Sequence, residues 1–424
     1  MGRLASLVAA LTLLTAPAFA QDGPRAAAEL NEMCLADARA LWGVSLCGPL
    51  LIADPTTRAV WASEQDRQGV LAAQGAGWAG VLPANVGIAN TSLDWAGVRW
   101  IMIAGPLPQD VTARRVLLMH EAWHRAQGEI GLSAQEGANA HLASERGRTL
   151  MRLELRALAT ALRSSNVGQR RAAQDALVLR AARQAAFPQA RGDETALDRN
   201  EGLASYTGVR LGAGAGARTY ALRTLDEFDA HDALARSYAY ASGPAYGLLL
   251  DDLRPRWRTE LGGGAPADIL AGVVRPDAAT PRNVSEASAR YGGQQVASEE
   301  RLRAEAAATR LAALRTAYAG PRLELALSNP QFEFNPNQVT PLEGLGGHYE
   351  TLVLRDSWGE LRASAGALIT QDFRSARAPA PGPDGLSGPG WSLTLAPGWR
   401  LAPPSADGVW RPIPDSAGPV SQPQ

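Results

Sequence analysis

The chain has 424 residues, of which 46% are hydrophobic and 20% are charged, so we expect a packed core and exclude global disorder. The net charge of −1 argues against nucleic acid or an anionic membrane as a partner. The length suits two or three domains.

The first 20 residues have the pattern of a secretory signal peptide. Arg3 gives a weakly basic start, an apolar run extends from Leu4 to Leu14, and Ala18-Phe19-Ala20 matches a small-x-small cleavage site. The apolar run is too short for a stable membrane anchor, so we expect no stable membrane insertion after cleavage. The alternative is an uncleaved N-terminal helix. The signal predicts a periplasmic or secreted protein.

The chain has two cysteines, Cys34 and Cys47. In an oxidising compartment we expect them to form one disulfide that closes a short N-terminal loop. Two lone cysteines at this spacing make a poor metal site. The alternative is a pair of free buried thiols.

The N-terminal part predicts a helix, then a small sheet, then a second helix. Apolar residues at helical spacing indicate the first helix, and Pro55-Thr56-Thr57 turns the chain between the first two strands. Gln109 or Asp110 can cap the second helix, which extends to about Gly128. The expected elements are a helix at 25–42 and strands at 48–54, 58–62 and 97–104.

The middle of the chain predicts helices with few interruptions. Residues 135–188 read as two helices broken near Ser164-Ser165-Asn166 and ended near Pro188. Residues 200–260 continue as helix, with an interruption at Gly212 to Gly216. Residues 262–282 read as a loop or linker, and 296–318 as a helix.

After Pro321, short alternating runs separated by turn residues predict strands. The expected fold class is therefore α+β. A small N-terminal sheet (45–108) and a mainly helical part (109–318) would form one domain over 21–318. A β-rich accessory domain would follow over 319–412, and a disordered tail over 413–424.

The segment from His120 to His124 reads H-E-x-x-H, the zinc-binding signature of many metallopeptidases. Two histidines four residues apart share one helix face and can reach one metal ion. Glu121 between them can take a proton from a metal-bound water. The chain has only five histidines, which makes a chance match improbable.

A catalytic zinc needs a third protein ligand. The downstream candidates are His141, Glu145, Glu154 and Glu201. A solvated helix face accounts for His141 and Glu145, and Glu154 between two leucines can pair with an arginine or support the site from outside it. A carboxylate at a helix N-terminus is the alternative for Glu201, because the helix dipole favours it there.

Around Glu201 the sequence Asn200-Glu201-Gly202-Leu203-Ala204-Ser205-Tyr206 resembles the gluzincin metallopeptidases, the thermolysin-like group. Many of them carry the third ligand in a downstream E-G-x-A-x-Y helix. The resemblance covers roughly residues 97–250 and is at the level of motifs. It implies a zincin-like domain and Zn²⁺ held by His120, His124 and Glu201. An inserted helical pair at 135–188 would account for a longer gap between motifs than in thermolysin.

The resemblance also implies an oxyanion donor downstream of the third ligand. Tyr240 in Tyr240-Ala241-Ser242-Gly243 matches a Y-x-x-G element, Tyr238 is the next candidate, and His231 is the third. The alternative role for each tyrosine is packing in the core. The alternative for His231, which lies beside two aspartates, is an ordinary surface histidine. Gluzincins bind the substrate backbone along an edge strand, which the resemblance places at Val98 to Ile103.

The sequence therefore predicts an exported zinc metallohydrolase, most simply a peptidase in which Glu121 is the general base and the partner is a peptide or protein substrate. One alternative is a catalytically inactive binding or envelope-assembly protein on a peptidase-like scaffold. The other is a zinc hydrolase of non-peptide substrates, because the same site polarises any carbonyl.

Overall fold

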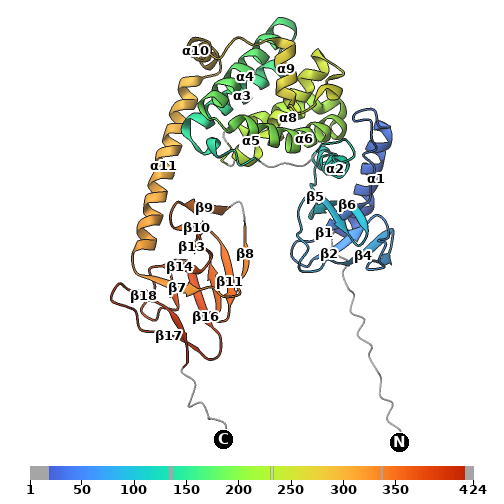
Figure 1. The fold of residues 1–424 in the computed structure, drawn as a ribbon. Helices are drawn as coiled ribbons and strands as arrows, with labels where there is room; N and C mark the ends of the chain where they lie inside the picture. The colour runs from blue at the N-terminus through green and yellow to red at the C-terminus, as the bar shows by residue number, and fades with distance from the viewer. Residues whose placement is uncertain (1–18, 133–136, 230, 233, 336–337, 416–424) are drawn as a thin grey trace, which may run out of the picture. The chain divides into compact units, whose positions relative to one another are not determined.

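A computed structural model describes residues 19–132, 137–229, 231–232, 234–335 and 338–415. The fold is mixed α+β, as the sequence predicts, and it divides into two compact units, Met1–Glu300 and Arg301–Gln424 (Figure 1). The expected signal peptide falls outside the described residues up to residue 18, and so do residues 416–424 of the expected tail. No helix within the described ranges is both long and apolar enough to cross a membrane.

The first unit begins with helix α1 (Phe19–Asp37) and a six-stranded sheet of order β3-β4-β2-β1-β6-β5. Strands β1 and β6 pair in parallel, and the other pairs are antiparallel. The Cys34–Cys47 disulfide predicted from the sequence joins α1 to the segment that enters the sheet. The strands are β1 (Leu50–Ala53), β2 (Ala59–Ala62), β3 (Ala72–Gln74), β4 (Gly77–Val81), β5 (Thr91–Trp95) and β6 (Val98–Ala104).

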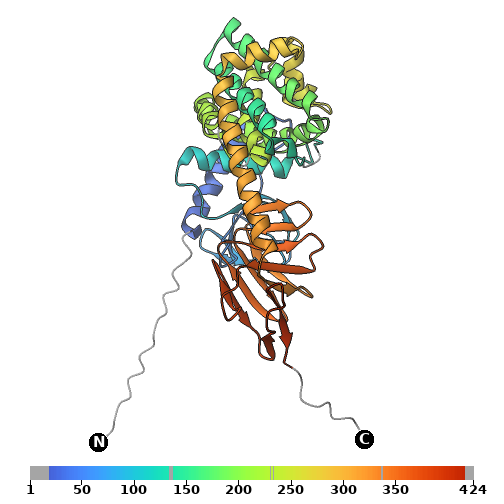
Figure 2. The ribbon, with the colours of Figure 1, turned by 90° about the vertical axis from the view of Figure 1, so that its left-hand side faces the viewer.

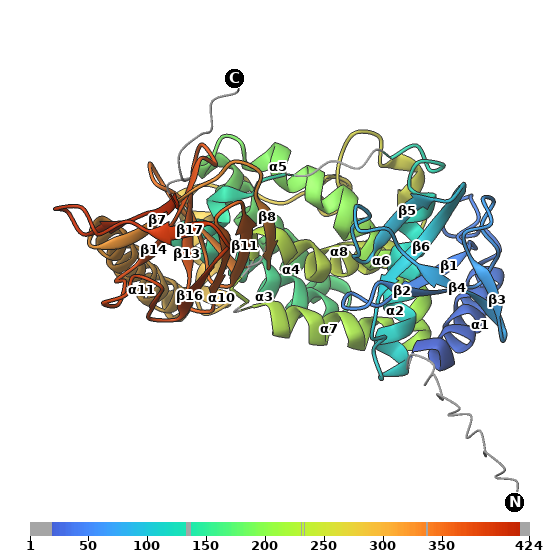
Figure 3. The ribbon, with the colours of Figure 1, turned by 90° about the horizontal axis from the view of Figure 1, so that it is seen from below.

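The position of β6 corrects one expectation. This strand is not an edge: it pairs with β1 on one side and β5 on the other, and β5 is the edge strand. Side chains alternate along the sheet, so Ile52 and Ile101 face a core shared with α1 and α2 (Val111–Ala126), whereas Trp100 faces the opposite layer. Figure 3 shows α1 and α2 beside this sheet.

The rest of the first unit is helical, with one large core. Helices α3 and α4 pair along their lengths, broken at Ser164 and Ser165 as expected. The elements are η1 (Ala140–Ala143), α3 (Glu145–Arg163), α4 (Asn166–Ala186), α5 (Ala190–Leu197), η2 (Asp198–Gly202), α6 (Leu203–Thr207), η3 (Gly208–Gly212), η4 (Gly214–Gly216), α7 (Ala217–Phe228), α8 (Leu234–Leu253), η5 (Trp257–Glu260), α9 (Pro266–Val274) and α10 (Pro281–Arg290).

The segment 262–282 is not the loop that its glycines and prolines suggest, because it contains α9. Pro266 and Pro281 are the first residues of α9 and α10. A backbone N–H at this position has no partner within the helix, so the N–H that proline lacks is not missed. The side chain of Thr280 caps α10 by accepting a hydrogen bond from the Asn283 amide at 3.3 Å. Composition alone therefore assigned α9, and the first two residues of α10, to a linker.

The second unit is β-rich, as predicted. Its division from the first falls inside α11 (Gly293–Ala319), between Glu300 and Arg301, earlier than the boundary expected at the end of that helix. Helix α11 is the long orange helix of Figure 2. Two larger sheets have the orders β18-β7-β14-β13-β10-β9 and β15-β16-β12-β11-β8, and β17 pairs with β19. Buried leucines and tryptophans, including Trp358 and Trp391, form their core.

The strands of this unit are β7 (Arg322–Ala326), β8 (Gln331–Phe334), β9 (Val339–Leu342), β10 (Gly346–Tyr349), β11 (Leu352–Asp356), β12 (Gly359–Ala363), β13 (Ala367–Thr370), β14 (Ser375–Pro379), β15 (Ser387–Gly388), β16 (Trp391–Leu395), β17 (Trp399–Leu401), β18 (Val409–Trp410) and β19 (Pro412–Pro414). Ile413 and Pro414 pair with β17, so the chain remains in regular structure beyond the point where the sequence predicted a tail.

Candidate metal centre

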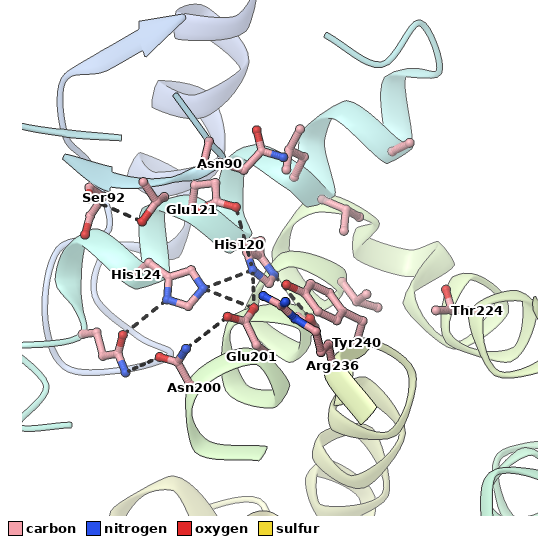
Figure 4. Close-up of a pocket in the computed structure, with 18 of the residues that line it drawn as sticks. Asn90, Ser92, His120, Glu121, His124, Asn200, Glu201, Thr224, Arg236 and Tyr240 are labelled. Atoms are coloured by element: carbon pink, nitrogen blue, oxygen red, sulfur yellow. Dashed lines mark hydrogen bonds and ion pairs between the residues drawn. The ribbon is translucent and has the colours of Figure 1, made fainter. Parts of the chain in front are cut away.

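Helix α2 carries the H-E-x-x-H segment. Its N-cap is Asp110, whose side chain accepts a hydrogen bond from the Ala113 amide at 2.7 Å. Leu118 and Ala122 are buried against the sheet, which fixes the rotation of the helix. His120 and His124, one turn apart, therefore point together toward the helical part of the unit, as Figure 4 shows.

Glu201 meets the two histidines. Its Oε2 atom lies 3.3 Å from Nε2 of His120 and 3.5 Å from Nε2 of His124. The two Nε2 atoms are 3.1 Å apart. Within the described residues, three side chains of the kinds that bind metals converge at one point, and they are His120, His124 and Glu201. The structure thus brings together the three ligands that the sequence predicts.

The triangle of donor atoms fits a small divalent ion. A tetrahedral ion with bonds of about 2.0–2.1 Å separates its ligand atoms by roughly 3.3–3.4 Å, close to the three separations found here. Oε2 of Glu201 is buried and accepts no hydrogen bond from the described residues. A buried carboxylate oxygen without a donor is costly, and a metal ion at this point would remove that cost. The donor set therefore suits a metal, without specifying which one.

Close helix contacts hold Glu201 in place. It lies in η2, a π-helical turn, which is a distortion often found at functional sites. A Cβ atom at Gly243 would lie 2.3 Å from the carbonyl oxygen of Gly202, and one at Gly208 would lie 2.5 Å from the carbonyl oxygen of Val116. Glycine at these positions lets α8 and α2 approach the segment that carries Glu201.

A chain of hydrogen bonds orients His124. The Gln127 Nε2 group donates to Oδ1 of Asn200 at 3.1 Å, and Asn200 Nδ2 donates to Oε1 of Glu201 at 3.0 Å. The remaining atom of the Gln127 amide, Oε1, is an acceptor, and it lies 3.3 Å from Nδ1 of His124. The proton of His124 must then be on Nδ1, which leaves a lone pair on Nε2 for a metal.

Ser205 plays the corresponding part for His120. Its hydroxyl oxygen is 3.3 Å from Nδ1 of His120 and can accept the Nδ1 proton, which again frees Nε2. Sequence reasoning did not select Gln127, Asn200 or Ser205 for these roles. The spacing held the signal: Gln127 is three residues after His124, Asn200 directly precedes the E-G-x-A-x-Y segment, and Ser205 lies within it.

Glu121 is 3% exposed, and its Oε1 atom lies 3.8 Å from Nε2 of His120. Its other oxygen, Oε2, is buried without a hydrogen-bond donor in the described chain. Burial raises the pKa of Glu121, more than the neighbouring histidines lower it. A carboxyl with a raised pKa beside a metal position is suited to accept and return a proton.

The pKa values of Glu201 and His124 shift in opposite directions. Burial acts to raise the pKa of Glu201, but the imidazoles of His120 and His124, whose Nε2 atoms face its Oε2, outweigh it, and the pKa is lowered. Burial acts to lower the pKa of His124, but Glu201 and Glu121 outweigh it, and the pKa is raised. Glu201 therefore stays ionised, as a metal ligand must.

Of the three predicted oxyanion donors, the structure brings Tyr240 to the site. Its ring stacks on that of His120, with centroids 5.4 Å apart and planes 8° apart. Burial and the nearby Glu201 carboxylate raise its pKa, so its hydroxyl keeps its proton. Tyr238 is fully buried and donates to the Glu194 carbonyl at 3.1 Å. The ring of His231 stacks on Phe228. Neither is among the described residues lining the cavity around Glu201.

The other candidate third ligands lie elsewhere. Glu154 is completely buried between Tyr246, which donates to it at 2.7 Å, and Arg183, whose Nη1 is 2.7 Å from its Oε2. Nε2 of His141 is 2.9 Å from Oε1 of Glu194. Glu145 is an exposed residue in the first turn of α3. The sequence-level choice of Glu201 over these three agrees with the geometry.

The centre opens into a cavity of about 910 Å³. One wall comes from residues 89–92, which lead into the edge strand β5, and the other comes from α7 and α8. Asn90 and Ser92 lie on the first wall, and Thr224 and Tyr240 on the second (Figure 4). This volume is in the range of binding sites for small ligands and short peptides.

Comparison with known protein families, with curated proteins and with solved structures finds no match to this chain. Inference about its function therefore rests on the geometry of the site.

Proposed function

We propose that this protein is an exported, zinc-dependent peptidase. The observation that carries the proposal is the convergence of His120, His124 and Glu201 next to Glu121, a buried carboxylate with an unpartnered oxygen. Three ligands leave a fourth position of a tetrahedral ion open, which distinguishes catalytic from structural zinc sites. A purely structural metal site would not need a buried, unpaired carboxylate beside it.

When bound, the zinc would polarise the scissile carbonyl and lower the pKa of water at the open position. Glu121 takes the proton of the attacking water and passes it to the leaving amine. Tyr240, protonated because its pKa is raised, donates a hydrogen bond to the developing oxyanion. Gln127, Asn200 and Ser205 hold the ligands in orientation through their hydrogen bonds.

The substrate would lie along β5. Residues 89–92 line the cavity, and β5 is an edge strand whose outer backbone groups are not used by the sheet. An extended peptide can pair with such an edge and place its carbonyl at the metal. This replaces the role first expected of β6, which is internal. The pairing favours a peptide over a small non-peptide ester or amide.

The disulfide between Cys34 and Cys47 fits an oxidising compartment. Together with the signal-like first residues it supports a periplasmic or extracellular location for the proposed enzyme.

The test measures metal content and peptide cleavage in the same preparations. Wild type should hold one zinc per chain and cleave members of a mixed peptide library. Glu201→Gln should lose zinc and activity, and Glu121→Gln should keep zinc while its turnover falls by roughly 10²- to 10⁴-fold. Asp226→Asn, which neutralises an exposed carboxylate outside the cavity, is the control and should change neither.

Two results would overturn the proposal. If the wild-type protein cannot be loaded with zinc, the metal centre is absent. If it is loaded but Glu121→Gln cleaves as fast as wild type, any cleavage arises from a contaminant or from another site.

A further inference from the structure

The charges that line the cavity are unequally paired. Arg99 donates to Asp94 at 2.7 Å and to Ser92 at 3.2 Å, and Glu227 lies 3.7 Å from Arg223. Arg236 also lines the cavity, yet it has no ion pair or hydrogen bond with any described residue. Among the described residues, it is therefore the lining arginine that forms no ion pair within 4 Å.

Arg236 lies close to the metal centre. It is on α8 four residues before Tyr240, so the two side chains share one face of the helix. Tyr240 in turn stacks on His120. Figure 4 shows the guanidinium of Arg236 beside Tyr240 and Glu201. The positive charge of Arg236 acts to lower the pKa of Tyr240, although burial and the Glu201 carboxylate outweigh it.

An uncompensated guanidinium at this position selects for a planar anion. Arginine binds a carboxylate through two parallel hydrogen bonds, which gives direction as well as energy. A divalent ion at the metal centre would add positive charge that the single ligand carboxylate of Glu201 does not neutralise. A substrate carboxylate reaching Arg236 would meet a favourable potential on both counts.

We infer that Arg236 is a specificity residue that binds a carboxylate of the substrate close to the scissile bond. This inference rests on the proposed peptidase function and narrows its substrate class to acidic peptides. The carboxylate has two possible sources, an Asp or Glu side chain and the C-terminus of the peptide, which Arg236 binds in the same way.

The test is equilibrium binding to the zinc-loaded Glu121→Gln protein, which cannot turn the ligand over at an appreciable rate. The probes are four peptides of one length: acetyl-pentaalanine amide, acetyl-pentaalanine free acid, and the amide with its central alanine replaced by glutamate or by glutamine. Because the alanine chain can slide, the carboxylate can find Arg236 from either side. The free acid and the glutamate peptide distinguish the two sources.

At least one acidic peptide should bind on the order of 10-fold more tightly than its neutral counterpart. Adding Arg236→Gln should reduce this ratio to near one and leave the neutral peptides' affinity unchanged, whereas Arg236→Lys should keep part of it. Arg163→Gln, which removes an exposed arginine paired with Asp226 outside the cavity, is the control and should keep the full ratio.

The possible failures are distinguishable. If the neutral peptides bind but the acidic ones gain nothing, the assignment of Arg236 is wrong and the peptidase proposal stands. An acidic preference that survives Arg236→Gln would come from the metal itself or from another residue, and it would also overturn the assignment. If no peptide binds the zinc-loaded protein, the peptide-binding function fails together with the inference.

Discussion

At the scale of single residues, the site depends on groups that do not touch the metal position. Asn200 and Gln127 link Glu201 to His124 in one hydrogen-bonded chain, and each bond fixes the orientation of the next group. Removing one member leaves the ligands in place but allows the His124 ring to take the other tautomer. Such outer groups commonly account for 10- to 100-fold in metal affinity.

Gln127→Leu is therefore expected to weaken zinc binding by roughly 10- to 100-fold while the fold is retained. Leucine fills a similar volume, but it cannot accept the Nδ1 proton of His124. Competition with a chelator of known affinity measures the change. Gln174→Leu, which removes a hydrogen bond from the middle of α4 to the Val274 carbonyl at the end of α9, should bind zinc as wild type does. Equal zinc affinity in both variants would mean that the amide does not set the tautomer.

Residue-level prediction reached its limit at the two tyrosines of α8. Tyr238 and Tyr240 are two positions apart, so at 3.6 residues per turn they point to nearly opposite sides of the helix. The sequence therefore indicates that one can face the metal and the other cannot. Which one does so depends on how α8 is rotated against α3 and α6, and that is a property of the packed core. The family motif favoured Tyr240, and the geometry agrees.

At the scale of elements, the sequence predicted helices better than the sheet. The apolar spacing that identifies α3 and α4 is independent of what packs around them. Strands β3 and β5 are three and five residues long and consist of exposed or half-buried residues, so no alternating pattern marks them. The edge strand was consequently assigned to the more apolar β6, whose run of four buried residues instead reflects a central position.

The contact between η2 and α8 decides where Glu201 lies. Gly243→Ala would place a methyl group 2.3 Å from the Gly202 carbonyl oxygen, so α8 must move away. We expect a loss of about 1–3 kcal/mol in the free energy of unfolding and weaker zinc binding, because Glu201 moves with η2. Urea unfolding and chelator competition measure the two effects.

The matched substitution is Gly272→Ala, in the interior of α9, where an added Cβ meets nothing within 4 Å. Alanine restricts the unfolded chain and favours helix, so this variant should be stabilised by about 0.5–1 kcal/mol. If Gly243→Ala were as stable as Gly272→Ala and bound zinc normally, the close approach of α8 would not be what positions the ligand.

At the scale of the whole molecule, the metal centre belongs entirely to the first unit, and a buried ionic network ties that unit together. Arg183 lies 2.7 Å from Glu154 of α3 and 2.5 Å from Glu194 of α5, and Arg180 lies 2.5 Å from Asp198 of η2. Asp198 is only three residues before Glu201. The network therefore connects the helical core to the turn that carries the third ligand.

The charges around Asp198 do not balance. The three carboxylates of the network face two guanidiniums, and the imidazole of His141 contacts Glu194 rather than Asp198. Oδ1 of Asp198 is buried without a hydrogen-bond donor among the described residues. Burial, helped by the charges of Glu194 and Glu154, raises the pKa of Asp198 to about 6, although Arg180 opposes the rise. In the unfolded chain the pKa of an aspartate is about 3.9. Between these values the folded state holds the extra proton, so stability is highest at the acid end of this window and falls as the pH rises through about 6.

Asp198→Asn removes this titration while keeping the size of the side chain. Wild type should lose stability as the pH rises from 5 to 7.5, and the variant should not. The free energy of unfolding of the variant, relative to that of wild type, should therefore increase by ~1–2 kcal/mol over this range. Urea unfolding in EDTA, followed by far-ultraviolet circular dichroism, reports this unit because α1 to α10 lie in it. Asp226→Asn alters only an exposed ion pair, which contributes little at either pH. A difference that stayed constant, or that moved in favour of wild type as the pH rose, would show that Asp198 is ionised throughout and that Arg180 alone compensates its burial.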